Sequence, residues 1–282
     1  MSPLWRDEVG VHLSPEKVCM VRLRRGLRPR VVAEYEQVVK TQTASVAAVG
    51  TDSRCSNWSA SLATAEQLLA QSQWRGATLH IVVADCWVRY SIVPWAADLR
   101  SAQERLAHAR QLLASAFGEA VSGWELRLSE APPGFARVAC AMPTELLAEI
   151  GALAARHNVP LVSLQPQLIF AYDNWRCSLP TAGAWFVTIG DGTLTAVRMG
   201  NRAWDRVHSI RIGSDWAREL KRLQKFGRLA SANTAEGAVY VDAPQAWREV
   251  AGPDGNELHW LEAQREPPTT LQRLGRVRRL AA

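Results

Sequence analysis

The sequence predicts an α/β protein made of two related lobes, and three observations support that class. Apolar residues make up 48% of the 282-residue chain and charged residues 21%, a balance typical of globular domains. Short runs rich in Val and Leu alternate with longer segments that have helical spacing. A strand-turn-strand pattern near the N-terminus returns in the second half of the chain. We therefore expect two α/β halves that arose by duplication.

The first half opens with three strand-like runs separated by the turn residues Ser14-Pro15 and Gly26-Leu27. The stretch 42–57 is polar and rich in small residues, which predicts a loop. Leucines and alanines then recur at helical spacing in two segments. We predict helices over 59–73 and 99–117. The predicted strands are 9–13, 17–24 and 30–39, then 79–84 and 87–93 as a pair, then 124–129 and 136–142.

Pro143 is well placed to open the next helix, because proline suits a first helical position. A strand at 159–164 and a helix at 166–175 follow, and 179–183 is a hinge candidate. Beyond the hinge we predict strands at 185–189, 194–199, 203–212 and 238–241, a helix at 214–226, a weakly patterned 244–266 and a helix at 269–280. The predicted lobes are 1–180, with an inserted strand-helix subdomain at about 79–142, and a shorter 181–282.

The repeat is the most informative feature of the sequence. Residues 9–26 read VGVHLSPEKVCMVRLRRG, and residues 185–200 read WFVTIGDGTLTAVRMG. At one constant offset His12 aligns with Thr188, Leu13 with Ile189 and Arg22 with Arg198. Both copies read strand, tight turn, strand. We expect the two copies to lie in separate sheets, each with its turn facing one cleft.

Charge and cysteine content exclude several classes of protein. The net charge is +6, but no aromatic-flanked basic stripe accompanies the 29 arginines, so no nucleic-acid partner is predicted. The cysteines number five, an odd count, and they lie far apart in the sequence. Both facts argue against a disulfide framework and against a zinc site, so no metal is predicted. No apolar run reaches 18 residues and the first nine residues include charges, so we expect a cytoplasmic protein.

Four segments in order resemble the actin-like (ribonuclease H-like, duplicated) ATPase superfamily, and within it the PilM/MshI group of type IV pilus assembly proteins and the type II secretion L protein. GVHLS (10–14) stands where that family has a first phosphate hairpin, and TIGDGTLTAVRMGNRAW (188–204) takes the place of the second. The runs HIVVADCWVRYSIVPW (80–95) and ACAMPTELLAEIGALAARHNVPLVSLQPQLIFAY (139–172) are similar to its intervening units.

The departures from this family concern the nucleotide chemistry. The resemblance implies a carboxylate in each hairpin to position Mg²⁺, yet this chain has His12 and Thr188 there. Ser14-Pro15 replaces a flexible glycine, and the adenosine-binding Gly-Gly pair is missing after 238–241. If phosphate binds at all, the hairpin residues expected to contact it are Ser14, Lys17, Gly190, Asp191, Gly192 and Thr193. Asp191 is also what an ordinary turn would contain.

The resemblance implies a scaffold of a pilus or secretion platform that binds the cytoplasmic N-terminus of a PilN-like inner-membrane protein. Loss of the motifs predicts a pseudo-ATPase with no cofactor. The alternative is a diverged ATPase or kinase that uses ATP and Mg²⁺ through Lys17, Asp191, Thr193 and Thr195.

The last predicted helix, 269–280, is amphipathic and cationic. Leu271, Leu274, Val277 and Leu280 share one face, and Arg273, Arg276 and Arg279 follow on an adjoining face. Two interpretations stay open: the helix packs on its own lobe with solvated arginines, or it docks on the anionic inner leaflet. The second interpretation predicts a protein peripheral to the inner membrane.

Overall fold

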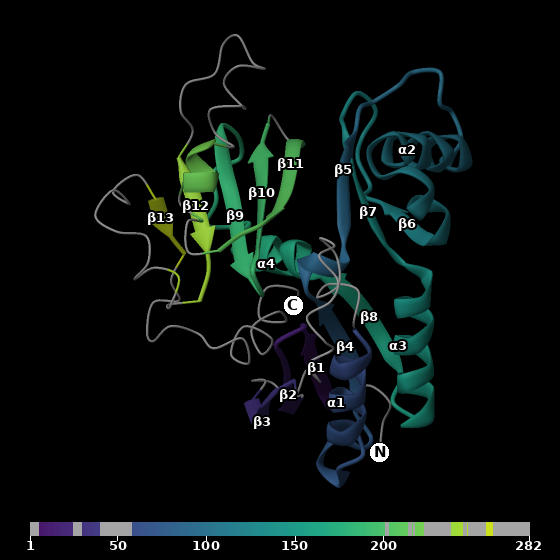
Figure 1. The fold of residues 1–282 in the computed structure, drawn as a ribbon, viewed down its shortest axis with the longest axis vertical. Helices are drawn as coiled ribbons and strands as arrows, with labels where there is room; N and C mark the ends of the chain where they lie inside the picture. Colours follow the sequence, from purple (N-terminus) through teal and green to yellow (C-terminus); the bar gives the residue numbers. More distant parts are fainter. Residues whose placement is uncertain are drawn as a thin grey trace, which may run out of the picture. The chain divides into compact units, whose positions relative to one another are not determined.

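A computed structural model gives the fold of the chain. It divides into two compact units, Met1–Trp87 with Glu145–Asn174, and Val88–Thr144 with Trp175–Pro267 (Figure 1). The predicted lobe boundary and inserted subdomain stay predictions. The structure describes residues 6–24, 30–39, 58–200, 203–213, 216, 218–222, 238–244, 247 and 258–261.

The first unit is built on a five-stranded sheet in the order β3-β2-β1-β4-β8. Its first three strands form an antiparallel meander, whereas β4 and β8 run parallel to β1. All six residues of β1 are buried, as expected for a strand in the middle of a sheet. The strands are β1 (Glu8–Leu13), β2 (Lys17–Arg24), β3 (Arg30–Val38), β4 (Thr78–Val83) and β8 (Leu161–Pro166).

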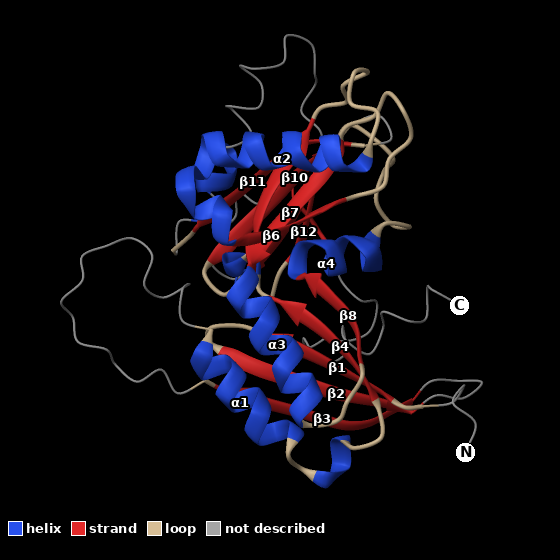
Figure 2. Ribbon diagram, turned by 90° about the vertical axis from the view of Figure 1, so that its right-hand side faces the viewer, coloured by secondary structure: helices blue, strands red, loops and turns tan. Residues whose placement is uncertain are grey.

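Three helices pack on this sheet: α1 (Ser59–Leu69), α3 (Thr144–Arg156) and α4 (Gln167–Trp175). Figure 2 shows α1 and α3 side by side over the sheet, and an ion pair between Glu66 and Arg156 at 3.0 Å joins them. Phe170 of α4 packs in a buried cluster with Cys19, Val21 and Val82.

One predicted strand pairing is wrong. Residues 79–84 and 87–93 were expected to pair with each other, but β4 pairs with β1 and β8, while β5 (Arg89–Val93) belongs to a different sheet. The cause is a short 3₁₀ turn at Asp85–Trp87, which redirects the chain instead of folding it back as a hairpin. Both strands exist as predicted; only their partners differ.

The second unit contains a small antiparallel sheet in the order β5-β7-β6, with β6 at Trp124–Leu128 and β7 at Arg137–Pro143. Helix α2 (Ala102–Phe117) covers it through Ala109 and Leu113. Ser101 starts this helix with a capping box: its hydroxyl accepts from the Glu104 amide at 3.1 Å, and the Glu104 carboxylate accepts from the Ser101 amide at 2.9 Å.

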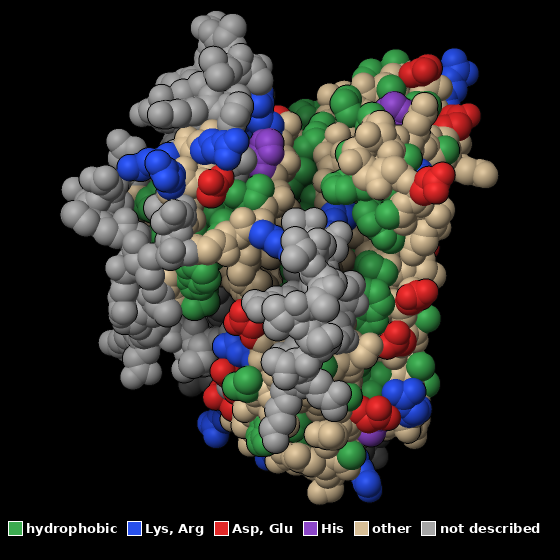
Figure 3. Space-filling view, viewed as in Figure 1, with side chains coloured by type: hydrophobic (Ala, Val, Ile, Leu, Met, Phe, Trp, Pro, Cys, Tyr) green, Lys and Arg blue, Asp and Glu red, His purple; other side chains and the backbone are tan. Residues whose placement is uncertain are grey.

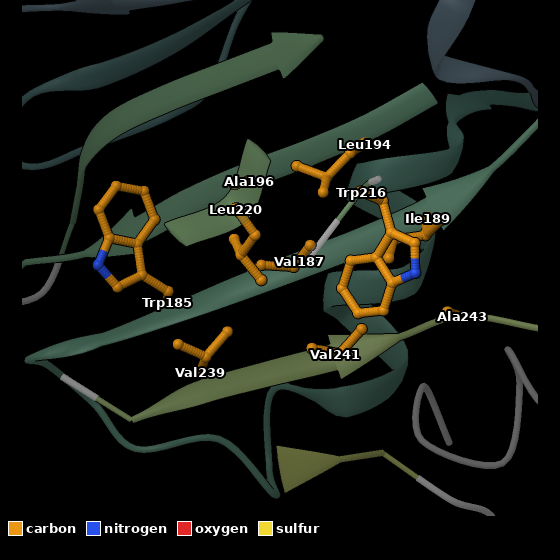
Figure 4. Close-up of a cluster of buried hydrophobic side chains, with 10 residues drawn as sticks. All are labelled: Trp185, Val187, Ile189, Leu194, Ala196, Trp216, Leu220, Val239, Val241 and Ala243. Atoms are coloured by element: carbon orange, nitrogen blue, oxygen red, sulfur yellow. The ribbon is translucent and has the colours of Figure 1, made fainter. Parts of the chain in front are cut away.

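The larger sheet of this unit has the order β11-β10-β9-β12-β13, and β11 lies beside β5 of the small sheet (Figure 1). Its core holds Val187, Ile189 and Val241 from the strands. Trp216 and Leu220 join them from the helical segment between β11 and β12 (Figure 4). The strands are β9 (Ala184–Gly190), β10 (Thr193–Met199), β11 (Trp204–Arg211), β12 (Val239–Asp242) and β13 (Leu258–Trp260).

The predicted duplication is confirmed by these two sheets. Each has an antiparallel three-strand meander followed by two strands parallel to its first strand. Strands β1 and β9 lie in separate sheets, as expected. Strand β13 lies in the segment 244–266, which showed only weak patterning. The predicted helix 269–280 lies outside the described residues.

Candidate functional site

The first candidate hairpin is the turn between β1 and β2, and Ser14 organises it. The Ser14 amide donates to the Lys17 carbonyl at 3.1 Å, and the Ser14 hydroxyl donates to the same carbonyl at 3.0 Å. The Lys17 amide in turn donates to the Ser14 hydroxyl oxygen at 3.2 Å. The Ser61 hydroxyl of α1 also stabilises the turn, because it donates to the Ser14 carbonyl at 2.8 Å. Ser14 is fully buried.

These bonds determine what the turn can offer to a ligand. A phosphate-binding turn needs several backbone N–H groups directed at the anion. Here the amides of Ser14 and Lys17 already donate within the turn, and Pro15 has no N–H group. Three of the four positions from Ser14 to Lys17 therefore have no amide to give to a phosphate.

The Lys17 side chain also contacts a residue of the same sheet. Its Nζ lies 3.2 Å from Oε1 of Glu36 on β3, and the Cys19 thiol donates to the other oxygen of that carboxylate at 3.4 Å. The structure thus places Lys17 in the same turn as Ser14 and directs its ammonium group to Glu36.

His12 occupies the position where the resemblance implies a carboxylate. It is buried, and its Nε2 lies 3.3 Å from Oε1 of Gln167, the first residue of α4. In the sheet His12 stands opposite Cys19 on one side and Val82 on the other. A histidine held against an amide in this way offers no oxygen anion to Mg²⁺.

Asp85 is a carboxylate that the sequence prediction missed, and it lies just beyond the carboxyl end of β4. It lies two residues after the end of β4, it is buried, and its Oδ1 accepts from the amide of Leu168 at 3.0 Å. Leu168 is in the first turn of α4, where an anion is stabilised by unpaired N–H groups and the helix dipole. The available signal was a charged residue immediately after an apolar strand.

The second candidate hairpin joins β9 to β10 and is a two-residue turn. Asp191 and Gly192 have φ values of 51° and 69°, while Gly190 and Thr193 pair on either side. Two consecutive positive φ angles are typical of a type I′ turn, for which Asp-Gly is a preferred sequence. The structure therefore brings Gly190, Asp191, Gly192 and Thr193 together, and turn geometry alone explains the Asp191 and Gly192 residue types.

Thr188 lies in a polar row that crosses the larger sheet. It stands opposite Thr195 on β10 and Asp242 on β12, and Thr195 stands opposite Ser209 on β11. The Thr188 hydroxyl donates to the Thr195 carbonyl at 3.4 Å, and the hydroxyls of Thr195 and Ser209 lie 3.2 Å apart. Asp242 is buried, and it is the second carboxylate that the sequence prediction did not single out.

The cross-strand neighbours of His12 in the first sheet correspond position by position to those of Thr188 in the larger sheet of the second unit. His12 pairs with Cys19 and Val82, as Thr188 pairs with Thr195 and Asp242. The repeat seen in the sequence is thus present in the pairing register of both sheets. Across the described residues, no group of three or more His, Cys, Asp and Glu side chains is arranged to hold a metal ion.

Comparison with solved structures identifies the fold. A PilM–PilN type IV pilus biogenesis complex matches with a TM-score of 0.67 and 14% identity, over 98% of both chains. A Bacteroides thetaiotaomicron protein with an actin-like ATPase fold and unknown function matches with a TM-score of 0.58 and 9% identity, over 91% of both chains. The chain has an actin-like ATPase fold.

A further match to this actin-like fold is the cytoplasmic domain of EpsL, an inner-membrane component of the Vibrio cholerae type II secretion system. Its TM-score is 0.57 at 13% identity, over 98% of this chain and 95% of that one. No family model matches the sequence, and no curated protein matches it. The expectation of a duplicated actin-like fold is confirmed. In the described part of the chain, no helix is long and apolar enough to cross a bilayer.

Proposed function

We propose that this protein is a cytoplasmic scaffold of a type IV pilus or type II secretion-like assembly platform, and that it binds the cytoplasmic N-terminal segment of a PilN-like inner-membrane protein. The observation that carries the proposal is the match over 98% of the chain to a PilM–PilN complex. The EpsL match, also over 98% of the chain, supports the same class of machine. The four sequence segments that resemble this family point in the same direction.

We further propose that the protein is a pseudo-ATPase. Phosphoryl transfer depends on positioning the phosphates and on Mg²⁺ ligands. The first hairpin uses the Ser14 and Lys17 amides internally, and Pro15 has none to give. The two positions expected to carry carboxylates hold His12 and Thr188, and each of them is hydrogen-bonded within its own unit.

The alternative is a diverged ATPase or kinase, and one observation favours it. Asp242 lies in register with Thr188, so a buried carboxylate accompanies the second hairpin although the expected position lacks one. Asp191 would supply a second oxygen anion in the turn itself. In this alternative ATP and Mg²⁺ would stabilise the folded protein, and Asp191→Ala would remove that stabilisation.

The proposed partner is testable by direct binding. The probe is a synthetic peptide with the cytoplasmic N-terminal sequence of the proposed PilN-like membrane protein, titrated calorimetrically, with a scrambled peptide as control. We expect saturable one-to-one binding of the native peptide only. If neither the peptide nor the full-length membrane protein in detergent binds, the scaffold proposal is wrong.

A peripheral position at the inner membrane stays a prediction that depends on 269–280. Co-sedimentation with anionic vesicles tests it, comparing the whole chain with a chain that ends at Glu266. We expect only the whole chain to pellet at low salt. Equal binding of both chains, or binding of neither, would contradict a membrane role for this segment.

A further inference from the structure

Strand β3 concentrates exposed apolar side chains at one edge of the first sheet. Eight large hydrophobic residues are exposed among the described residues, and half of them lie on this nine-residue strand. Val31, Val32, Tyr35 and Val38 are exposed by 43%, 44%, 38% and 71%. Figure 3 shows apolar side chains next to acidic and basic ones at the lower edge where Figure 1 places β3.

Among the described strands, β3 pairs only with β2, so its other edge faces no described strand. A free edge presents a row of N–H and C=O groups that can pair with another strand. Proteins protect such edges with charged side chains, above all lysine, and with proline, short length or a bulge. Strand β3 has neither lysine nor proline; it has three charged residues and one register shift, opposite Arg22 and Leu23.

The charges on β3 indicate which kind of strand fits this edge. Arg30 stands at its start, and Glu34 and Glu36 stand towards its end, so the edge is cationic at one end and anionic at the other. A uniformly cationic peptide would be repelled at Arg30. A second copy of β3 in antiparallel orientation instead places opposite charges together at both ends, which stabilises cross-strand pairs.

We propose that two copies of this chain associate through β3, edge to edge, about a two-fold axis near Ala33. This register sets Arg30 of each copy opposite Glu36 of the other, and Val31 opposite Tyr35. Such an interface is isologous, because the same surface contributes from both copies. Glu36 is already 3.2 Å from Lys17, so each partner arginine would extend an existing ion pair.

The association is expected to be weak and reversible. One pair of strands buries less than the roughly 1,200 Å² at which stable interfaces begin. Its specificity would therefore come from the charge register and its affinity from the apolar residues. This proposal does not depend on the pilus or secretion role, since it concerns the protein alone.

Sedimentation equilibrium of the purified chain over a wide concentration range tests the proposal. We expect a reversible monomer–dimer equilibrium, and amide hydrogen exchange in β3 that slows as the concentration rises. Arg30→Glu alone and Glu36→Arg alone should each give monomers, because each places like charges opposite one another. An equimolar mixture of the two variants should dimerise, since an acidic side chain then faces a basic one at both ends of the paired strands.

Matched reversals at exposed sites elsewhere, Arg75→Glu and Glu130→Arg, should leave the equilibrium unchanged, and circular dichroism confirms that each variant is folded. A wild-type chain that stays monomeric, single variants that still dimerise, or a mixture that stays monomeric would each overturn the proposal. If the wild type is monomeric and the β3 reversals instead abolish binding of the membrane protein's peptide, the edge serves that partner and the dimer is wrong.

Discussion

Ser14 and Lys17 close the β1–β2 turn on itself. The Ser14 hydroxyl accepts from the Lys17 amide at 3.2 Å and donates to the Lys17 carbonyl at 3.0 Å. A glycine at this position would leave the Lys17 amide able to turn towards an anion. The serine hydroxyl thus satisfies the Lys17 amide within the turn itself.

This closure predicts a measurable loss of stability in Ser14→Ala. Removal of the hydroxyl leaves the partly buried Lys17 amide without its acceptor, which should lower the free energy of unfolding by about 1–3 kcal/mol. Denaturant unfolding followed by circular dichroism measures the change. Ser115→Ala is the matched control, because Ser115 makes a similar bond on the exposed face of α2. Equal losses in both variants would contradict the role of Ser14.

The second prediction concerns the contact of Asp85 with α4. Asp85→Ala should destabilise the protein by about 1–3 kcal/mol, since the Leu168 amide loses its acceptor. Asp85→Asn should cost less, because its amide oxygen can still accept. Exposed Asp98 provides the control, and Asp98→Ala should stay within about 0.5 kcal/mol of wild type. If Asp85→Ala and Asp98→Ala behave alike, Asp85 does not stabilise the helix.

Trp216 anchors the core of the second unit and gives the third prediction. It is fully buried, its Nε1 donates to the Trp247 carbonyl at 3.2 Å, and its ring meets Trp260 edge-on with centroids 5.7 Å apart. Trp216→Ala should lower the free energy of unfolding by about 3–5 kcal/mol. Half-exposed Trp95 is the matched control and should tolerate alanine far better. A Trp216→Ala variant as stable as Trp95→Ala would contradict this packing.

His208 gives a prediction about pH. Burial lowers the pKa of His208 below its ordinary value of 6.5, and the positive charge of Arg206 lowers it further. The unfolded chain then takes up a proton near pH 6.5 while the folded protein does not. Proton uptake by the unfolded chain alone favours unfolding. The contribution of His208 to the free energy of unfolding is therefore fully present above pH 6.5 and is lost as the pH falls through the folded-state pKa.

Unfolding free energies measured from about pH 7.5 to about pH 5.5 test this sign, and these limits are about one unit from the ordinary pKa on either side. We expect the wild type to lose stability over this range more steeply than His208→Gln. An identical slope in the two proteins would show that His208 is protonated equally in both states.

The sequence was sufficient for features that are local. The strands around Ser14 and around Asp191 follow from apolar runs and turn residues a few positions apart, and the repeat followed from aligning His12 with Thr188. These predictions needed no knowledge of tertiary contacts, because turn geometry and strand periodicity are encoded in adjacent residues.

Long-range relationships were not accessible in the same way. Asp85 bonds to an amide 83 positions away, and Asp242 joins the row of Thr188 only through strand pairing. The false pairing of β4 with β5 has a similar origin, since the 3₁₀ turn at Asp85–Trp87 redirects the chain within three residues. Apolar patterning cannot distinguish this turn from a hairpin.

The central claim is that the protein is a pseudo-ATPase, and titration with Mg-ATP tests it most directly. Two quantities are measured at each nucleotide concentration: the melting temperature and the rate of phosphate release. A ligand at 100 times its dissociation constant stabilises a protein by about 2.7 kcal/mol. Because the Ser14 turn is closed, we predict no shift of the melting temperature at millimolar Mg-ATP and no phosphate release above the rate without protein. A clear shift together with turnover that Asp191→Ala abolishes and Asp98→Ala retains would contradict the pseudo-ATPase account.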